Sequence, residues 1–411
     1  MPVSTHPNLR RAAVIGGGPA GLMAAETFAA AGVEVGVYDR MPSVARKFLM
    51  AGRGGLNLTH TQPFAAFLAR YGAAEARLKP IIEAFSPEAL RGWAKGLAQS
   101  LFVGSSGRVF PMAMKASPLL RAWLKRLGEM GVTFHTGHDW RGWDASGTLR
   151  FHAVTGDVAV RSDVTVLALG GASWPRLGSD GSWAAMLEAR GVGVAPFRAA
   201  NAGFDVAWSE VFARFAGEPL KGIALSFGGT VQRGEAMVTH YGLEGGAVYA
   251  LSARLREAIA RDGVARLTVD LRPEMRVEDI ARKLERPAAG QSRSNHLRRA
   301  LGLAPVAVNL MREAGPLPRD AGALAALVKA APLTLTGMQG LARAISSAGG
   351  VKWDAVDGGL QLNAMPGVYV AGEMLDWEAP TGGYLLQACF ATGHAAASAA
   401  SKALGVEPPT R

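Results

Sequence analysis

The amino-acid sequence of 411 residues predicts an α/β fold in which a Rossmann-like domain is built from both ends of the chain. Three observations support this prediction. A strand, a glycine cluster and a helix follow one another within residues 12–31, an apolar strand closes on two glycines at 164–171, and a strand with glycines returns at 367–383. We expect this domain to comprise residues 1–190 and 346–411. Residues 191–345 should form an inserted domain, partly β-barrel-like and partly helical.

The first glycine cluster, Gly16, Gly18 and Gly21, has the spacing G-x-G-x-x-G between a buried strand at 12–15 and an Ala-rich helix at 22–31. In such a unit the first glycine makes the tight turn and the second lets the backbone approach a pyrophosphate. The third lets the helix pack closely on the strand. The free N–H groups and the positive end of the helix dipole favour phosphate at the same place. The cluster, including Ala20, therefore predicts a dinucleotide site.

A second apolar strand, 33–38, ends at Asp39, about twenty residues beyond the glycines, where a carboxylate can accept a hydrogen bond from a ribose hydroxyl. The same carboxylate should repel a 2′-phosphate, which favours FAD or NAD over NADP. The adjacent Arg40 also belongs to the predicted site, and its charge keeps NADP open as an alternative.

A second glycine-rich segment, KFLMAGRGGLNLTH, spans residues 47–60. Its backbone N–H groups could wrap a dinucleotide, and its cations could contact phosphate. The alternative is an ordinary glycine-rich loop. The predicted cofactor-binding residues of this segment are Lys47, Gly52, Arg53, Asn57 and Leu58.

The segment from 63 to 171 alternates between helical and strand patterns. Apolar spacing predicts helices within 63–101, and a further helix is expected at 118–130. Strands at 132–136, 149–154 and 157–160 should form a small meander crossing the main sheet, with the backbone of Trp140 facing an adenine. The apolar run 164–171 predicts a strand covered on both faces, where Gly170 and Gly171 let the backbone lie against a flat ligand.

The inserted domain should combine strands at 223–227, 236–239 and 267–271 with a helix at 249–262 and a basic helical stretch at 282–300. It holds no second G-x-G-x-x-G between a strand and a helix, so we expect no separate nicotinamide-binding domain. The glycine-flanked segment HYGLEGG at 240–246 should be a loop turned inward, and the domain should cover the cofactor.

The last part of the chain returns to a nucleotide-binding pattern. Residues 367–373 predict a strand that ends in a glycine and a glutamate, and the glutamate could bind a ribityl chain or, through water, the pyrophosphate. The helix that follows begins with exposed N–H donors, which would stabilise negative charge on a reduced flavin. The predicted cofactor-binding residues here are Gly372, Glu373, Thr381, Gly382, Gly383 and Tyr384.

The composition, with 49 % hydrophobic and 19 % charged residues, describes a globular protein. Because Cys389 is the single cysteine, the chain cannot form an internal disulfide or a multi-thiol metal site. We therefore expect no metal and a reducing, cytoplasmic environment. No apolar run predicts a membrane span, and the polar start of the chain indicates no signal peptide.

The net charge of +11 raises the question of an acidic or nucleic-acid ligand. Arginine is densest at 282–300, where Arg293, Arg298 and Arg299 could line one surface. A solvated helical face is the favoured interpretation, since no aromatic residue is interleaved there for base stacking. We expect a small-molecule substrate as partner rather than a nucleic acid, and the oligomeric state stays open.

Further blocks accompany the first motif in a fixed order. They are GGGPAGLMAA at 16–25, KFLMAGRGGLNLTH at 47–60, LALGGASWPRLGSDG at 167–181, THYGLEGG at 239–246, AISSAGGV at 344–351 and GVYVAGEMLDWEAPTGGYLLQACFATG at 367–393. Together they resemble the FAD-dependent flavoproteins of the aminoacetone oxidase and 3-dehydro-bile-acid reductase type, within the two-dinucleotide-binding-domain flavoproteins. The resemblance implies FAD as cofactor and an FAD-binding domain made from both chain ends.

One block departs from the family pattern. Where relatives typically carry G-G-G-R-C-N, this chain has GRGGLN at 52–57, so the arginine is displaced and Leu56 replaces the cysteine. Any role of that thiol near the flavin is lost here, which implies that this branch acts on a different substrate.

The resemblance implies an FAD-dependent oxidoreductase in which hydride passes through flavin N5. Two directions stay open: an oxidase of amine-type small molecules, or a reductase of unsaturated carbonyl compounds that uses NAD(P)H as a transient donor. His240, as a residue type that titrates near neutrality, and Lys352 are the candidate catalytic residues, with structural and surface roles as their alternatives. Two other functions remain: an RNA-binding or tRNA-modifying flavoprotein, and a redox-inert flavin-binding protein.

Overall fold

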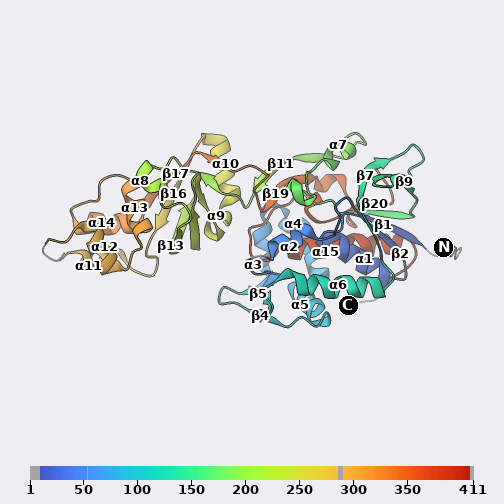
Figure 1. Ribbon diagram of the computed structural model, residues 1–411, viewed down its shortest axis with the longest axis horizontal. Helices are drawn as coiled ribbons and strands as arrows, with labels where there is room; N and C mark the ends of the chain where they lie inside the picture. Colours follow the sequence, from blue (N-terminus) through green and yellow to red (C-terminus); the bar gives the residue numbers. More distant parts are fainter. Residues whose placement is uncertain (1–9, 53, 286–289, 408–411) are drawn as a thin grey trace. The chain divides into compact units, whose positions relative to one another are not determined.

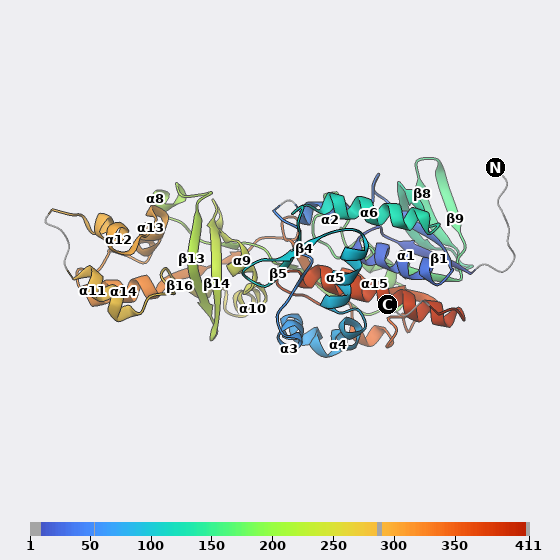
Figure 2. The same cartoon turned by 90° about the horizontal axis from the view of Figure 1, so that it is seen from below.

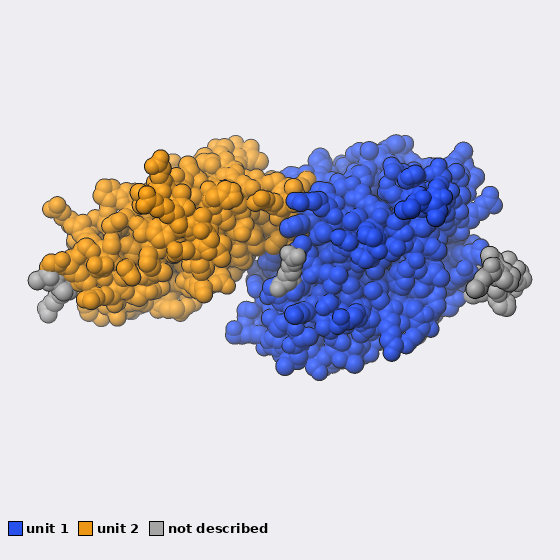
Figure 3. Space-filling view, viewed as in Figure 1, with its two compact units in different colours: residues 1–198, 346–411 blue, residues 199–345 orange. Residues whose placement is uncertain are grey.

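The computed structural model describes residues 10–52, 54–285 and 290–407, which form two compact units (Figure 3). Unit 1 combines the chain up to residue 198 with the chain from 346 onward, and unit 2 is the continuous segment 199–345. The sequence predicts that residues 191–198 belong to the insertion, but these residues lie in unit 1. They belong to unit 1 because β11 (Val194–Ala200) pairs with β19 (Ser346–Val351).

Unit 1 is organised around a parallel sheet of five strands in the order β20-β10-β1-β2-β6. Its central strands are apolar and almost wholly buried, as strands covered on both faces must be. The strands are β1 (Arg11–Ile15), β2 (Glu34–Asp39), β6 (Thr133–Thr136), β10 (Val164–Leu167) and β20 (Val368–Val370).

The strand expected at 132–136 does not join a meander, so that part of the prediction is wrong. β6 follows α6 (Ala116–Glu129), and a strand that returns through a crossover helix joins its sheet in parallel. β6 accordingly pairs with β2 at the edge of the main sheet. The meander consists of β7 (His138–Trp143), β8 (Leu149–Ala153) and β9 (Gly156–Val160), joined antiparallel.

Helices from distant parts of the chain lie beside this sheet (Figure 1). α1 (Pro19–Ala30) and α15 (Tyr384–Ala403) lie side by side although they come from opposite ends of the sequence (Figure 2). The remaining helices of unit 1 are α2 (Arg46–Ala51), α3 (Phe64–Leu68), α4 (Glu75–Ala84), α5 (Pro87–Gly96) and α7 (Trp183–Glu188), with 3-10 turns at Ala69–Ala74, Pro175–Leu177, Trp353–Ala355 and Gly372–Met374. A small antiparallel sheet contains β3 (Thr59–His60), β5 (Arg108–Pro111) and β4 (Leu101–Val103).

The contact between α1 and α15 depends on one glycine. A Cβ added to Gly393 would lie 2.2 Å from the carbonyl oxygen of Ala20. No side chain fits at that distance, so glycine lets the two backbones touch. Small buried residues on both helices, such as Ala24 and Ala397, continue the close packing.

Unit 2 holds a seven-stranded antiparallel sheet in the order β17-β16-β13-β14-β15-β12-β18, together with a group of helices. The strands are β12 (Phe204–Asp205), β13 (Pro219–Phe227), β14 (Thr230–Val238), β15 (Gly242–Glu244), β16 (Ala265–Asp270), β17 (Ala331–Leu335) and β18 (Gly337–Met338). The helices are α8 (Glu210–Ala213), α9 (Gly246–Tyr249), α10 (Ser252–Asp262), α11 (Val277–Leu284), α12 (Arg293–Leu301), α13 (Pro305–Glu313) and α14 (Ala321–Lys329).

The segment HYGLEGG is not wholly the loop that the sequence predicts. Gly242–Glu244 forms β15, which pairs with both β12 and β14 inside the sheet. The glycine pattern hid this strand because a Cβ at Gly242 would lie 1.9 Å from the Phe204 carbonyl oxygen, so the glycine serves a close strand contact rather than a free turn.

Within the three described ranges, no helix has both the length and the apolar character that crossing a bilayer demands.

A pair of identical substitutions tests the helix contact. Gly393→Ala should lower the free energy of unfolding by about 1–3 kcal/mol, since the new Cβ forces α1 and α15 apart. Gly128→Ala, in the exposed part of α6 where nothing lies within 4 Å of the added Cβ, should be neutral or stabilise by up to about 1 kcal/mol. Urea unfolding of both variants measures the difference. Equal effects would contradict the assigned contact.

Candidate functional site

A pocket opens where the parallel strands of unit 1 end. Its lining includes Ile15 at the end of β1, Asp39 at the end of β2, Ala168 after β10 and Ala371 after β20. Open α/β sheets bind their ligands in this crevice, beyond the carboxyl ends of the strands. The pocket encloses about 980 Å³, counting the space open to solvent at its mouth.

The pocket brings together predicted cofactor residues from segments far apart in the sequence. The ones that line it are Gly16, Gly18, Ala20, Asp39, Arg40, Lys47, Trp140, Gly170, Gly372 and Glu373. Other lining residues, among them Tyr38, His138, Asp180 and Trp183, are not among the predicted ones. Asp180 lies within the block at 167–181 and Trp183 just after it, so that block is the signal that could have indicated them.

The three glycines of the first cluster have different surroundings. Gly16 has a φ of +103° and its Cβ would lie 2.3 Å from the Ala168 carbonyl oxygen, so it shapes the tight turn. A Cβ on Gly21 would lie 1.9 Å from the Gly16 carbonyl oxygen, which leaves the helix no room for a side chain. A Cβ added to Gly18, in contrast, would meet no atom of the described residues within 4 Å beyond its chain neighbours. The open space therefore sits at the start of α1, where helix N–H groups favour phosphate.

Asp39 is held by the backbone at both carboxylate oxygens. The Gly17 N–H donates to Oδ2 and the Met41 N–H donates to Oδ1, each at 2.8 Å. Burial raises the pKa of the Asp39 carboxyl, against the lowering effect of these two hydrogen bonds. Because a carboxylate oxygen can accept twice, both oxygens keep capacity for a ribose hydroxyl. The predicted ribose contact stays a prediction.

Two ion pairs cross the pocket region. Arg40 Nη1 lies 2.7 Å from Asp180 Oδ2. Lys47 Nζ donates to Glu373 Oε2 at 2.8 Å and to Ser173 Oγ at 2.7 Å. The sequence predicts a phosphate contact for Lys47, but two of the three N–H donors of its ammonium group are already engaged within the protein, which leaves one for a ligand.

Two buried donors at the pocket have no partner among the described residues. One is Trp140 Nε1, on a side chain that is only 5 % exposed, and the other is Arg46 Nε. A buried polar group without a partner is costly, so each is a place where a ligand acceptor would be favourable. With the open space at Gly18 and the free capacity of Asp39, these donors fit the phosphates, ribose and base of FAD.

Cys389 also lines the pocket, but its thiol is an unreactive one. Complete burial raises the pKa of the Cys389 thiol far above its ordinary range, with the charge of Glu373 adding to the effect. A thiol kept in its neutral form is a poor nucleophile.

Other predicted cofactor residues lie beside the pocket rather than in its lining. Gly52 packs on α6, where its Cβ would meet Ala116 at 2.6 Å, and Gly171 packs on Ser347 of β19. Asn57 Oδ1 is buried without a partner in the described chain, and Leu58 is buried in the core. Arg53 lies outside the described residues.

The predicted residues at the start of α15 gather around β3. A Cβ on Gly383 would lie 2.6 Å from Thr59 Cα, so the helix start is pressed against the strand. The ring of Tyr384 stacks on His60 with centroids 5.8 Å apart. Thr381 and Gly382 precede this contact in sequence.

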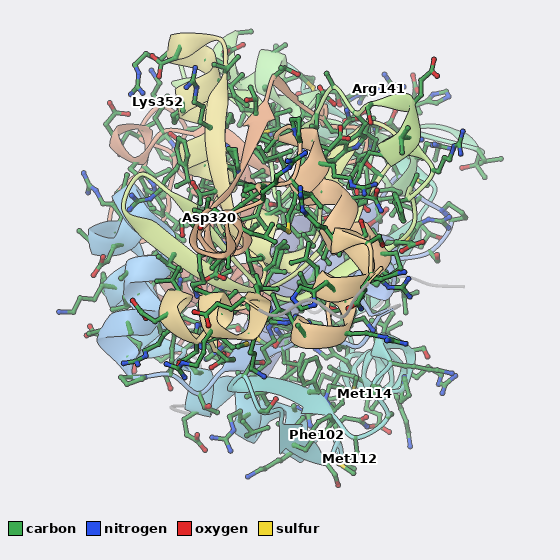
Figure 4. All side chains as sticks on the ribbon, turned by 90° about the vertical axis from the view of Figure 1, so that its left-hand side faces the viewer. Phe102, Met112, Met114, Arg141, Asp320 and Lys352 are labelled. Atoms are coloured by element: carbon green, nitrogen blue, oxygen red, sulfur yellow. The ribbon has the colours of Figure 1, made fainter. Side chains whose placement is uncertain are left out.

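The two predicted catalytic residues belong to different units. His240 is exposed in unit 2, between β14 and β15, and its ring contacts Tyr241 with centroids 5.2 Å apart. Lys352 is exposed in unit 1 at the start of a 3-10 turn (Figure 4). Neither lines the pocket.

The fold and the pocket together define a class: a Rossmann-type nucleotide-binding flavoprotein. A family model described as HI0933-like protein Rossmann domain matches residues 10–399. The chain belongs to this family and is an FAD-dependent oxidoreductase, as the sequence resemblance implies.

Curated relatives span nearly the whole chain. The 3-dehydro-bile acid delta(4,6)-reductase of Clostridium scindens is 27 % identical over 96 % of this chain and 100 % of its own length. The ribosomal RNA dihydrouridine synthase of Escherichia coli is 25 % identical over 94 % of this chain and 96 % of its own length.

Solved structures share the fold. The 3-ketosteroid-delta4-(5alpha)-dehydrogenase of Rhodococcus jostii aligns with a TM-score of 0.53 and 18 % identity, covering 97 % of this chain and 98 % of its own. The 3-ketosteroid delta1-dehydrogenase of Sterolibacterium denitrificans aligns with a TM-score of 0.54 and 13 % identity, covering 95 % and 99 %.

The open space at Gly18 can be filled without disturbing the fold. Gly18 has an ordinary backbone conformation, φ −80° and ψ −177°, so Gly18→Val should fold with unchanged stability. Its side chain would occupy the position that a pyrophosphate approaches, and FAD affinity should fall at least about tenfold. Gly92→Val, at an equally open helical glycine outside the pocket, is the matched control. FAD retention after gel filtration reports the effect, and undiminished retention by Gly18→Val would remove the phosphate assignment.

Proposed function

We propose that this FAD-dependent oxidoreductase reduces a carbon–carbon double bond conjugated to a carbonyl group in a small-molecule substrate, with NAD(P)H as the transient donor. When bound, FAD supplies two-electron redox chemistry through its N5 position. Overall, NAD(P)H gives up a hydride and becomes NAD(P)⁺, a proton comes from the protein or water, and the double bond becomes a single bond.

The observation that carries this proposal is a polar cluster at the start of α15, the donor group, in which the Gln62 amide holds the donor left for a ligand. Tyr384 donates to Gln62 Oε1 at 3.2 Å, while Gln62 Nε2 is buried with no partner among the described residues. His60 stacks on Tyr384 and accepts from the Gln62 backbone N–H at 3.0 Å. Arg108 pairs with His60 across β3 and β5, which brings its backbone beside this group.

Positive charge dominates the surroundings of this donor group. The charges acting on both His60 and Tyr384 are those of Arg70 and Arg108. Burial lowers the pKa of His60, which keeps the imidazole neutral near pH 7, and burial raises the pKa of the Tyr384 hydroxyl, which keeps its proton. Such a place stabilises a carbonyl oxygen that gains negative charge, and it repels a protonated amine. The electrostatics therefore support reduction of a carbonyl compound over oxidation of an amine.

The names of the curated relatives support the same reaction class. The Clostridium scindens protein is named as a reductase of double bonds in a 3-dehydro bile acid. The Escherichia coli protein is named for forming dihydrouridine, which is uridine with its ring C=C bond reduced. In both substrates the reduced bond is conjugated to a carbonyl group.

His240 and Lys352 stay candidates for the proton-transfer steps. Burial raises the pKa of Asp376 in unit 1, and the Lys352 charge is a lesser, opposing influence on that carboxyl.

A second candidate substrate is a uracil base within RNA. The relatives named as ribosomal RNA dihydrouridine synthases match this chain over 94 % and 95 % of its length. The net charge of +11 agrees with a polyanionic substrate.

Anaerobic spectroscopy of the FAD-loaded protein tests the reaction. NADH or NADPH should bleach the flavin absorbance, and cyclohex-2-en-1-one should restore it while the saturated ketone accumulates. A panel of small amines should cause no bleaching. Bleaching by amines together with peroxide formation in air would replace the reductase by an oxidase.

Removal of one charge tests the donor group. Arg108→Met keeps side-chain length but removes the cation, and we expect the rate of flavin reoxidation by the enone to fall about tenfold or more. Flavin reduction by NAD(P)H should change much less, and Arg108→Lys should recover part of the loss. Arg77→Met, at an exposed arginine on α4, is the control. An unchanged reoxidation rate in Arg108→Met would contradict the assigned role.

A further inference from the structure

The helical part of unit 2, residues 272–329, carries a surplus of positive charge. Its sequence holds eleven arginines and lysines against six acidic residues. Most of these acids already have partners. Glu274 pairs with Arg233, and Asp279 pairs with both Arg276 and Arg282.

Two further acidic side chains accept hydrogen bonds at the starts of helices. Glu313 accepts from the backbone N–H and the hydroxyl of Ser209 at 2.9 and 2.7 Å, beside the start of α8. Asp320 caps α14 by accepting from the Ala323 N–H at 2.7 Å (Figure 4). Neither carboxylate forms an ion pair among the described residues. The acids of this part are thus largely committed to other tasks.

Six arginines of this part have no acidic partner within the described ranges. Arg272 donates its guanidinium N–H groups to backbone carbonyl oxygens, and the other five are exposed. Arg298 and Arg299 lie exposed on α12 and make no side-chain hydrogen bond there. The others are Arg293, Arg312 and Arg319, all exposed. Arg293 donates only to the Leu317 carbonyl oxygen at 2.8 Å and Arg312 only to Ser294 Oγ at 2.7 Å. Each guanidinium therefore keeps most of its five donors.

Several of these arginines face a common hollow. Arg293, Arg312 and Arg319 line it together with His296. The carboxylates of Glu285 and Asp320 also border it, so its three arginines face two negative charges, and Arg298 and Arg299 lie outside its lining. On α12, Asn295 lies between Arg298 and Arg299 on the exposed face, opposite the buried Leu297 and Leu301, because residues three and four apart share a face.

We propose that this arginine surface, formed by Arg293, Arg298, Arg299, Arg312 and Arg319, binds the phosphate backbone of an RNA stem. Guanidinium forks match phosphate oxygens with paired hydrogen bonds, better than lysine would. The proposal adds an RNA partner to the proposed function. It rests on the second candidate substrate, a uracil base within RNA, only for the choice of RNA over other polyanions.

The residue content of this part favours a paired stem. Residues 272–329 contain no Phe, Tyr or Trp, so they offer no platform for stacking unpaired bases. Base-paired RNA is recognised mainly through its shape and its phosphates. An anionic membrane fits less well, since Val277 is the large apolar side chain exposed here among the described residues.

Fluorescence anisotropy with the FAD-loaded full chain tests the proposal. The probe is a labelled RNA hairpin with a stem of about 16 base pairs. Affinity should fall steeply with salt, with log K losing about 0.9 per phosphate contact for each unit of log salt concentration. The double variant Arg298→Glu/Arg299→Glu should bind at least about tenfold more weakly with a shallower salt slope, because two phosphate contacts are lost. Adding Arg319→Glu should weaken it further.

A matched control carries the same charge change on unit 1. Arg77 and Arg121 are exposed on α4 and α6 without an ion pair among the described residues, so Arg77→Glu/Arg121→Glu should leave hairpin binding close to wild type. Equal losses in both double variants, salt-independent binding, no binding by the wild type, or preference for phosphatidylserine-rich vesicles would each overturn the proposal. Reduction of cyclohex-2-en-1-one by the same variants separates this outcome from failure of the proposed function, because the arginine surface takes no part in that reaction.

Discussion

The direct contact between the backbones of α1 and α15 is the constraint on which unit 1 depends. At Gly393 the carbonyl oxygen of Ala20 occupies the place where a side chain would be, and small residues along both helices maintain the approach. Since α1 starts at the glycine turn and α15 starts just after Gly383, this contact fixes the distance between the glycine end of the pocket and the residues around Tyr384. Packing, rather than any charged group, sets the geometry of the site.

An ion pair then joins two distant chain segments at the pocket. Lys47 reaches Glu373, which is 326 positions away in the sequence, and Ser173 completes the group. The side chains of Lys47 and Glu373 are only 24 % and 13 % exposed, and a charged hydrogen bond that is partly shielded from water is worth more than one on the surface. The polar lining of the pocket thus comes from three separate chain segments.

The sequence predicts the parts of this structure that local rules decide. The strand, turn and helix at 11–30 follow from the spacing of three glycines, and so does the pocket at the end of β1. Residues 132–136 were misassigned because pairing is chosen by the preceding crossover helix, which places β6 beside β2. Gly242 was predicted to lie in a loop for a similar reason. In a sequence, a glycine that a close strand contact requires cannot be distinguished from a glycine that a turn requires. The partners of Lys47 and the stacking of Tyr384 on His60 depend on long-range packing that no single-sequence pattern records.

The division of the parallel sheet between the two chain ends has a consequence for the order of events during synthesis. β1, β2, β6 and β10 are translated before unit 2, whereas β20 and α15 are translated after it. Unit 2 is a single continuous segment and can fold as it emerges, since domains generally fold as units. The nascent first half must therefore wait with one sheet edge and one helix-binding face uncovered. The pocket lining is complete only once Gly372 and Glu373, which follow β20, have joined it, so the strands of the first half lack that part of the lining while unit 2 is being made.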